Sequence, residues 1–178
     1  KGVEVKIADD GEILIKGDNL MKGYLGKEKE TKDKIKNNWL YTGDIGELDK
    51  DNHLIITDRK KDIIVTSGGD NIAPQKIENM FSTNYLISQV IIFGDNRPFL
   101  IALIFVNNEF IKKKEINNKI DIYVKKINEK LSAIEKIRKY ILISGELTQK
   151  NGFLTPTMKI KRKKVYEKYK KDIDDLYN

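Results

Sequence analysis

The sequence contains no cysteine, one histidine and only three prolines in 178 residues. The lack of cysteine excludes disulfide bonds and thiolate metal ligands, and it fits a reducing compartment. With His53 as the only histidine, we expect neither a histidine-based metal cluster nor a Ser-His-Asp triad within the chain. The longest apolar run, at 99–106, falls far short of the roughly 18 residues that a membrane span requires.

The formal net charge of +7 comes almost entirely from lysine, because the chain has only four arginines. A composition rich in Lys, Asn and Ile is weak evidence by itself for binding to nucleic acid or membrane. A solvated basic surface is the simpler interpretation. Hydrophobic residues make up 39% of the chain, which is enough for a buried core.

The first 59 residues show the patterns of small antiparallel β structure. Apolar residues alternate at 3–7 and 13–15 around a polar turn at 9–11, which predicts a β-hairpin. A lysine-rich stretch at 27–37 predicts a helix, and a second hairpin is predicted from 45–48 to 54–57. Because so few strands do not make a stable sheet alone, residues 1–59 are expected to be the end of a larger N-terminal domain.

From residue 60 onward the pattern changes to a small mixed α/β domain with the order β-α-β-β-α-β-α. Pro74 suits the first turn of a helix at 74–82. The continuous apolar runs at 89–95 and 99–106 predict strands covered on both faces. Helical spacing continues through 107–141, in two pieces, before a strand at 141–144 and a terminal helix at 162–176. The predicted fold class is α/β (α+β), with an antiparallel β subdomain followed by this mixed domain.

Four stretches of the sequence resemble the adenylate-forming enzymes, which include acyl-CoA synthetases, luciferases and peptide-synthetase adenylation domains. The stretches are "GEILIKGDNLMKGYL" at 11–25, "YTGD" at 41–44, "DRKKDIIVTSGGDNIAP" at 58–74 and "LTPTMKIKR" at 154–162. The segments "SGGDNIAPQKIE", "GDNRPFLIALI" and "LTPTMK" are most similar to the long-chain fatty acyl-CoA synthetase branch. The family's glycine-rich phosphate loop has no counterpart here, so the resemblance implies the C-terminal portion of such an enzyme, with a mobile lid domain at 60–178.

The resemblance implies an AMP-forming acid–thiol ligase. Such an enzyme forms acyl-AMP from ATP and a fatty acid, and then transfers the acyl group to coenzyme A. The implied partners are fatty acid, ATP, coenzyme A and the missing N-terminal domain, with no nucleic acid. Mg²⁺ is expected to have its ligands mostly upstream, and an isolated portion is expected to be inactive. A cytoplasmic location is expected, with peripheral association at the inner membrane face left open.

Two charged residues match the family's nucleotide-binding positions. By resemblance, Asp44 holds the ribose diol, Arg59 contacts the nucleotide, and Tyr41 packs beside it. A guanidinium also suits ribose or phosphate oxygens better than an ammonium does. The structural alternatives are a polar turn for Asp44, a surface ion pair for Arg59 with Asp58 or Asp62, and a buried ring for Tyr41.

Lys159 is the expected catalytic residue. By resemblance, its ammonium reaches the α-phosphate and carboxylate oxygens during adenylation. Family members usually carry glycine just before this lysine, whereas this chain has Met158. The basic residues at 161–164 are expected to form a solvated helix face. No metal ligand is assigned.

Two further positions concern movement and the second half-reaction. By resemblance, Lys61 is the hinge of the lid, and Ser67, Gly68 and Gly69 form the loop that lines the coenzyme A tunnel. Glycine permits close backbone approaches that side chains would block. The alternative is a loop that only caps the helix at Pro74.

Two other functions stay open from the sequence alone. One is an adenylate-forming ligase for another carboxylic acid, since the acyl pocket lies mainly in the part that has no counterpart here. The other is a basic module that binds nucleic acid or lipid through "KIKRKKVYEKYKK". The second alternative predicts steeply salt-dependent binding.

Overall fold

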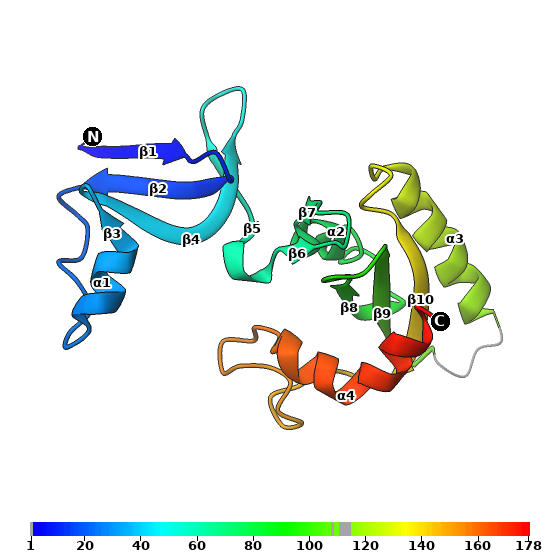
Figure 1. The fold of residues 1–178 in the computed structure, drawn as a ribbon. Coiled ribbons are helices and arrows are strands. Elements are labelled where there is room, and N and C mark those ends of the chain that lie inside the picture. Colours follow the sequence, from blue (N-terminus) through cyan, green and yellow to red (C-terminus); the bar gives the residue numbers. More distant parts are fainter. Residues whose placement is uncertain (1, 108, 111–114) are drawn as a thin grey trace. The chain divides into compact units, whose positions relative to one another are not determined.

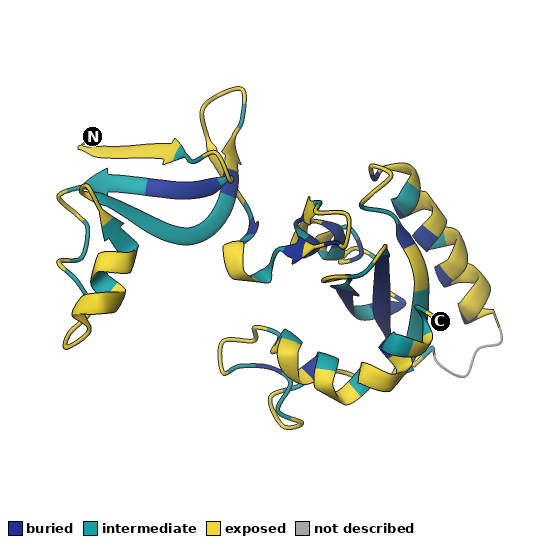
Figure 2. Cartoon of the chain, viewed as in Figure 1, coloured by how far each residue is buried: buried dark blue, intermediate teal, exposed yellow. Residues whose placement is uncertain are grey.

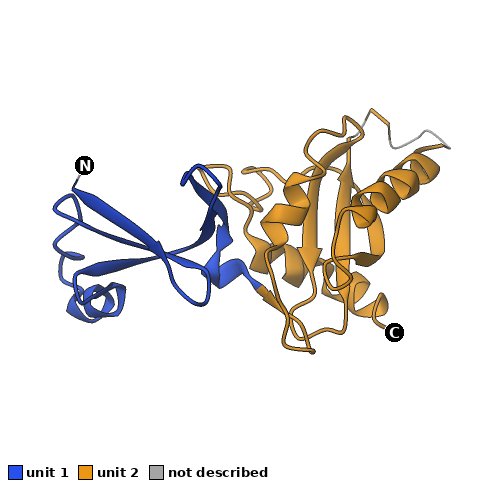
Figure 3. Cartoon of the chain, turned by 90° about the horizontal axis from the view of Figure 1, so that it is seen from above, with its two compact units in different colours: residues 1–63 blue, residues 64–178 orange. Residues whose placement is uncertain are grey.

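The computed structural model describes residues 2–107, 109–110 and 115–178. The chain divides into two compact units, residues 1–63 and residues 64–178 (Figure 3). We refer to them as unit 1 and unit 2. The boundary predicted at residue 59 and the hinge predicted at Lys61 stay predictions.

Unit 1 is an antiparallel sheet with one short helix (Figure 1). The strand order is β1-β2-β4-β3, and β5 pairs with β4. Its elements are β1 (Val3–Ile7), β2 (Glu12–Gly17), α1 (Glu28–Lys34), β3 (Ile35–Lys36), β4 (Trp39–Leu48), β5 (Leu54–Arg59) and the 3₁₀ turn η1 (Lys60–Asp62). Both predicted hairpins are confirmed, by the pairing of β1 with β2 and of β4 with β5. The predicted helix at 27–37 is shorter, because its last residues form β3.

Unit 2 is built around a three-stranded sheet in the order β10-β9-β8. β8 and β9 are antiparallel, whereas β9 and β10 are parallel. The elements are β6 (Ile64–Val65), β7 (Asn71–Ile72), α2 (Pro74–Asn79), β8 (Ile87–Phe93), β9 (Leu100–Val106), α3 (Ile116–Glu129), β10 (Ile137–Ser144) and α4 (Arg162–Asp175). The predicted mixed α/β class is confirmed.

The core of unit 2 lies on both sides of β9, whose seven residues are all buried (Figure 2). On one face, Leu100, Ala102 and Ile104 belong to a cluster with residues of α2 and α3. On the other face, Leu103 and Phe105 pack in a cluster that includes residues of α4. This arrangement confirms the prediction of strands covered on both faces.

The predicted pair of helices between 107 and 141 is wrong in its second half; residues 108 and 111–114 lie outside the described residues. α3 ends at Glu129, and β10 begins at Ile137, four residues earlier than predicted. Across the break, the side-chain amide of Asn128 exchanges two hydrogen bonds of 2.9 Å with the backbone of Ile137, which holds the start of β10 beside the end of α3. Ile134, which continues the helical spacing, is 48% exposed.

The longest helices among the described residues, α3 and α4, have 14 residues each. No helix in this described part of the chain has both the length and the apolar character needed to cross a bilayer.

Candidate nucleotide site

Asp44 and Arg59 face each other across β4 and β5, where they are register partners. Arg59 Nε donates a hydrogen bond of 2.9 Å to Asp44 Oδ1. The Arg59 side chain is 43% exposed and the Asp44 side chain is 32% exposed. A carboxylate and a guanidinium are therefore held side by side and remain accessible to a polar ligand.

The segment Thr42–Gly43–Asp44 is fixed by hydrogen bonds within β4 and to β2. Thr42 Oγ1 donates to the carbonyl of Ile13 at 2.7 Å and accepts the amide of Asp44 at 3.1 Å. Gly43 has a φ of +77°, a left-handed conformation that favours glycine. Its amide donates to Glu12 Oε1 at 2.7 Å. Asp44 is thus presented by an ordered stretch of strand.

A pocket of about 450 Å³ lies beside this pair within unit 1. Its lining residues are Glu12, Asp33, Lys34, Lys36, Tyr41, Gly43, Arg59, Lys60 and Lys61. Five of these side chains are basic and two are acidic, so the pocket favours an anion. The structure therefore brings together three residues predicted from the sequence: Tyr41, Arg59 and Lys61.

Trp39, by contrast, is covered by lysines rather than lining the pocket. Lys6 Nζ lies 4.3 Å and Lys16 Nζ 5.7 Å from the centre of its ring. Tyr41 has Lys36 Nζ 5.3 Å from its ring centre. Of these two aromatic residues, Tyr41 is the one in position to contact a ligand in the pocket.

The sequence did not point to Lys60, which is the most strongly paired cation of the pocket. Its Nζ donates to Asp10 Oδ2 at 2.6 Å and to Glu12 Oε2 at 2.8 Å. The hydrogen bonds to these carboxylates raise the pKa of Lys60, and the one to Lys60 lowers the pKa of Asp10. Asp10 lies in the turn between β1 and β2, and Glu12 is the first residue of β2. They are 50 and 48 residues from Lys60 in the sequence, so only the folded chain brings them to it.

In unit 2, Lys159 lies in a tight turn between Leu154 and Ile160, which form an isolated antiparallel bridge. The backbone amide of Thr155 donates to the Lys159 carbonyl at 2.8 Å, and the Lys159 amide donates to Thr155 Oγ1 at 3.0 Å. Met158 has a φ of +63°. Met158, at a position where family members usually carry glycine, therefore has a backbone conformation that favours glycine.

The loop that contains Ser67, Gly68 and Gly69 is a second exposed turn of unit 2. The Gly69 amide donates to the Thr66 carbonyl at 2.9 Å, and Gly69 has a φ of +87°. The Ser67 amide donates to the carbonyl of Arg97 at 3.0 Å. This loop and the Lys159 turn are thus held by different segments of unit 2.

The expectation that the basic residues at 161–164 form a solvated face is wrong for Arg162. Its Nη2 lies 2.5 Å from Glu78 Oε2, and its Nη1 donates to the carbonyl of Ile92 at 3.2 Å. The side chains of Arg162 and Glu78 are only 23% and 11% exposed. Arg162 therefore anchors the start of α4 to α2 and β8. Lys161, Lys163 and Lys164 are exposed.

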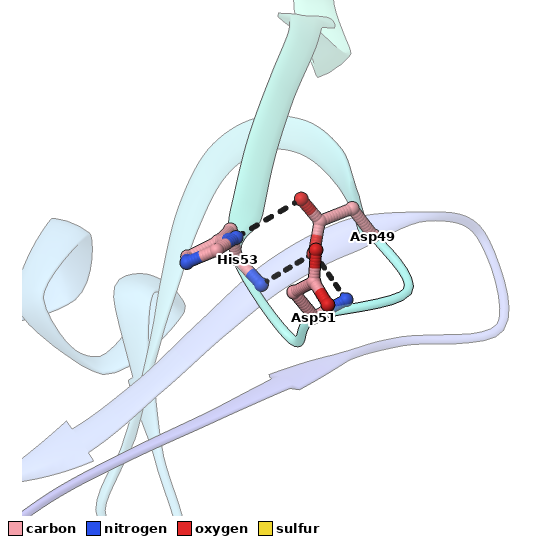
Figure 4. A group of neighbouring side chains, drawn as sticks. All are labelled: Asp49, Asp51 and His53. Atoms are coloured by element: carbon pink, nitrogen blue, oxygen red, sulfur yellow. Dashed lines mark hydrogen bonds and ion pairs between the residues drawn. The ribbon is translucent and has the colours of Figure 1, made fainter.

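Asp49, Asp51 and His53 form the one group of potential metal ligands found among the described residues (Figure 4). One ligand atom from each lies within 4.8 Å of the others. Asp49 Oδ1 accepts the backbone amides of Asp51 and His53, each at 2.8 Å, and Oδ2 lies 3.1 Å from His53 Nδ1. The hydrogen bond from the His53 amide lowers the pKa of Asp49. These bonds shape the turn between β4 and β5 and account for the grouping.

Comparison with known proteins gives a match to one family over most of the chain. The family described as AMP-binding enzyme C-terminal domain matches residues 61–178. The chain is 41% identical to the long-chain-fatty-acid–CoA ligase FadD15 of Mycobacterium tuberculosis, over 99% of this chain and 33% of that protein. It is 33% identical to the long-chain-fatty-acid–CoA ligase 6 of Rattus norvegicus, over 95% of this chain and 27% of that protein. The chain thus spans about a third of the length of these curated relatives.

Solved structures show the same fold. The A domain of a carboxylic acid reductase from Segniliparus rugosus, in complex with AMP and a co-purified carboxylic acid, matches 99% of this chain and 31% of its own. Its TM-score is 0.84 at 22% identity. The o-succinylbenzoate CoA synthetase of Bacillus subtilis, in complex with its acyl-adenylate intermediate, has a TM-score of 0.72 at 25% identity, over 92% of this chain and 34% of its own.

Proposed function

The chain belongs to the AMP-binding enzyme C-terminal domain family, and from this membership we propose that it is the C-terminal part of a long-chain fatty acid–CoA ligase. The enzyme forms acyl-AMP and pyrophosphate from a fatty acid and ATP, and then passes the acyl group to the thiol of coenzyme A. The substrate class rests on the 41% identity to a long-chain-fatty-acid–CoA ligase over 99% of this chain.

The observation that carries the proposal is the Asp44–Arg59 pair beside a basic pocket. A carboxylate accepts hydrogen bonds from the two vicinal hydroxyls of a ribose, and a guanidinium donates to ribose or phosphate oxygens. The five basic side chains at the pocket suit the charge of a nucleotide. We assign Asp44 and Arg59 to the ribose side of ATP and of the acyl-adenylate, with Tyr41 beside them.

Lys159 is the proposed catalytic residue of adenylation. An ammonium placed near the α-phosphate and carboxylate oxygens stabilises negative charge that develops in the transition state. Its tight turn restrains the backbone, and its side chain is exposed and available to a ligand. We propose that Ser67, Gly68 and Gly69 serve the coenzyme A step instead, and that rotation about Lys61 exchanges the two arrangements.

Mg²⁺ enters this proposal as part of the ATP substrate. The buried carboxylate at the pocket, Glu12, already accepts hydrogen bonds on both oxygens. It therefore does not fit a metal ligand, and we assign no Mg²⁺ ligand to this pocket. The proposed partners of the chain are the fatty acid, ATP, coenzyme A and the N-terminal domain of the ligase.

The experiment that tests the proposal separates the two half-reactions in the full-length protein. Lys159→Ala is expected to lower the rate of acyl-AMP formation from a long-chain fatty acid by about 10²- to 10³-fold, the loss typical of one placed electrostatic donor. Formation of acyl-CoA from supplied acyl-adenylate is expected to change far less. Lys150→Ala, an exposed lysine on the preceding turn, is the matched control and should leave both rates unchanged.

Equal losses in both half-reactions would contradict the role of Lys159. A full-length protein that exchanges pyrophosphate with ATP only in the presence of another class of carboxylic acid would contradict the long-chain substrate. The 178-residue chain alone is expected to form no acyl-AMP, because it has no counterpart of the family's phosphate loop.

We further propose a cytoplasmic enzyme that associates peripherally with the anionic inner face of the membrane. The support is the exposed lysines of α4, which are Lys163, Lys164, Lys168, Lys170 and Lys171. Each basic side chain near such a surface contributes about 1 kcal/mol. Sedimentation with vesicles of phosphatidylglycerol should exceed that with phosphatidylcholine and fall with added salt, and equal sedimentation with both would exclude this association.

A further inference from the structure

We propose that Glu12 is a positioning residue for nucleotide binding, because one carboxylate holds the neighbours of both Asp44 and Arg59. Glu12 Oε1 accepts the amide of Gly43 at 2.7 Å, and Gly43 directly precedes Asp44. Glu12 Oε2 accepts Lys60 Nζ at 2.8 Å, and Lys60 directly follows Arg59. The inference rests on the proposed function, in which Asp44 and Arg59 bind the ribose.

The Glu12 side chain is buried, with 4% of its surface exposed, whereas Lys60 is 47% exposed. A buried carboxylate is strongly destabilising unless its oxygens are hydrogen-bonded or paired with a cation. Here, one oxygen has the Gly43 amide and the other has the ammonium of Lys60. Both contacts are therefore favoured whether or not the pocket holds a ligand, and they preorganise it.

The backbone position of Glu12 is fixed by the pairing of β2 with β4. Glu12 lies at the start of β2 and is the register partner of Ile45 in β4, with a register shift just after it. Its amide donates to Asp10 Oδ1 at 3.1 Å, and Asp10 Oδ2 is the second acceptor of Lys60. The hairpin between β1 and β2 thus supplies both acceptors that hold Lys60.

The contact between Glu12 and Lys60 matters because the chain leaves the sheet directly after β5. Arg59 is the last residue of β5, and Lys60 begins the 3₁₀ turn that leaves the sheet. A strand end is held by few backbone hydrogen bonds and frays easily. The ammonium of Lys60 is tied to β2, so Arg59 stays in register with Asp44.

The test is the variant Glu12→Gln in the full-length protein. Glutamine retains an oxygen for the Gly43 amide but places a donor against the ammonium of Lys60. We expect the KM for ATP to rise about tenfold, with kcat for acyl-AMP formation changed less than about threefold, since a ribose contact acts on binding. The matched control is Glu4→Gln, which removes the exposed 3.1 Å ion pair with Lys16 in the same sheet and should leave KM unchanged.

A rescue variant separates positioning from general destabilisation. In Glu12→Gln combined with Lys60→Gln, two amides can pair with each other, so the KM for ATP should recover by several-fold relative to Glu12→Gln alone. If Glu12→Gln raised the KM for ATP only by destabilising the fold, adding Lys60→Gln would raise the KM further. If Glu12→Gln does not fold, Lys60→Met alone tests the same contact from the half-exposed partner. Because Lys60 also lines the pocket, the readout is then amide exchange without nucleotide, which should accelerate at Arg59.

Amide hydrogen exchange of Gly43 in the 178-residue chain gives a readout that needs no activity. Glu12→Ala, which removes both acceptor oxygens, should accelerate exchange at Gly43 and at Arg59, and Glu4→Ala should not. An unchanged KM for ATP in Glu12→Gln, with an active wild-type enzyme, would overturn the inference. A wild-type enzyme without adenylation activity would overturn the proposed function, and unchanged exchange at Gly43 would overturn the positioning contact independently.

Discussion

Replacing Arg162 with methionine tests the anchoring of the turn that carries Lys159. Arg162 pairs with Glu78 of α2, and both side chains bind the backbone of Ile92: Glu78 Oε1 accepts its amide at 2.8 Å and Arg162 Nη1 donates to its carbonyl. Arg162→Met removes the guanidinium and keeps an unbranched apolar chain in place of the arginine stem. The Glu78 carboxylate then keeps the Ile92 amide but loses the guanidinium of Arg162 in a largely buried position.

The expected cost follows from burial. Breaking a fully buried ion pair by removing one partner costs about 3–5 kcal/mol, whereas an exposed pair contributes about 0–1 kcal/mol. Arg162 and Glu78 are 23% and 11% exposed, so we place the loss between these limits, at about 2–3 kcal/mol of the free energy of unfolding of unit 2. Glu78→Gln combined with Arg162→Met should cost about 1–2 kcal/mol less than the sum of the single variants.

Urea unfolding of the 178-residue chain measures this effect in the two units separately. Far-ultraviolet circular dichroism follows mainly unit 2, which contains both 14-residue helices. Fluorescence of Trp39, the only tryptophan, follows unit 1 and should not change. Arg138→Met is the matched control, since Arg138 is exposed and its Nη2 lies at 3.5 Å from the carbonyl oxygen of Ala133, a weak contact. A loss for Arg162→Met no larger than that for Arg138→Met would refute the argument.

Three further variants test other features of unit 2. Met158→Gly should raise the free energy of unfolding by about 0.5–1 kcal/mol, because the relief of a left-handed backbone (about 1–2 kcal/mol) exceeds the entropy cost of glycine; a loss of stability in urea would contradict this. Burial and the hydrogen bond to Asp121 raise the pKa of Tyr140 from 10.0 to about 12, so its contribution is full below pH 10 and is lost as the pH rises toward 12. Tyr140→Phe should therefore show a less steep fall in the free energy of unfolding over that range, and an equal slope would exclude the effect. Leu103→Ala, at a fully buried position of β9, should cost about 3 kcal/mol by thermal or urea unfolding, whereas Ile122→Ala, which is 54% exposed, should cost less than about 0.5 kcal/mol; similar losses at both positions would contradict the assigned core.

The elements that the sequence predicted well are those with strong local patterns. The apolar runs that became β8 and β9 are buried on both faces, and alternation marked the hairpin of β1 and β2. The break after α3 was missed, because Leu131 and Ile134 continue the helical period. The break is marked instead by a contact of the folded chain, in which the Asn128 side chain is hydrogen-bonded to the carbonyl and the amide of Ile137.

In the candidate site too, some residues could be located from short sequence motifs and others only from the folded structure. Asp44, Arg59 and Lys159 stand in short motifs, so resemblance located them, and their roles stay predictions. Glu12 and Lys60 are 48 residues apart. Both lie in stretches that carry the family resemblance, but no function was assigned to either side chain from the sequence. Their contact depends on the register of β2 against β4 and on the direction in which the chain leaves β5, which only the folded sheet determines.

Two of the three outer strands of the unit 1 sheet, β1 and β5, differ in how they are protected from other chains. β1 alternates Val3 and Val5 with Glu4 and Lys6, and such charges oppose pairing with a second chain. Among the described residues, β5 pairs with β4 alone, and it begins with three exposed apolar residues, Leu54–Ile56, before its first charge at Asp58. An outer strand of this kind is a template for intermolecular β pairing. Unfolding measurements on the 178-residue chain should therefore be made at several protein concentrations, because association through β5 would make the transition depend on concentration.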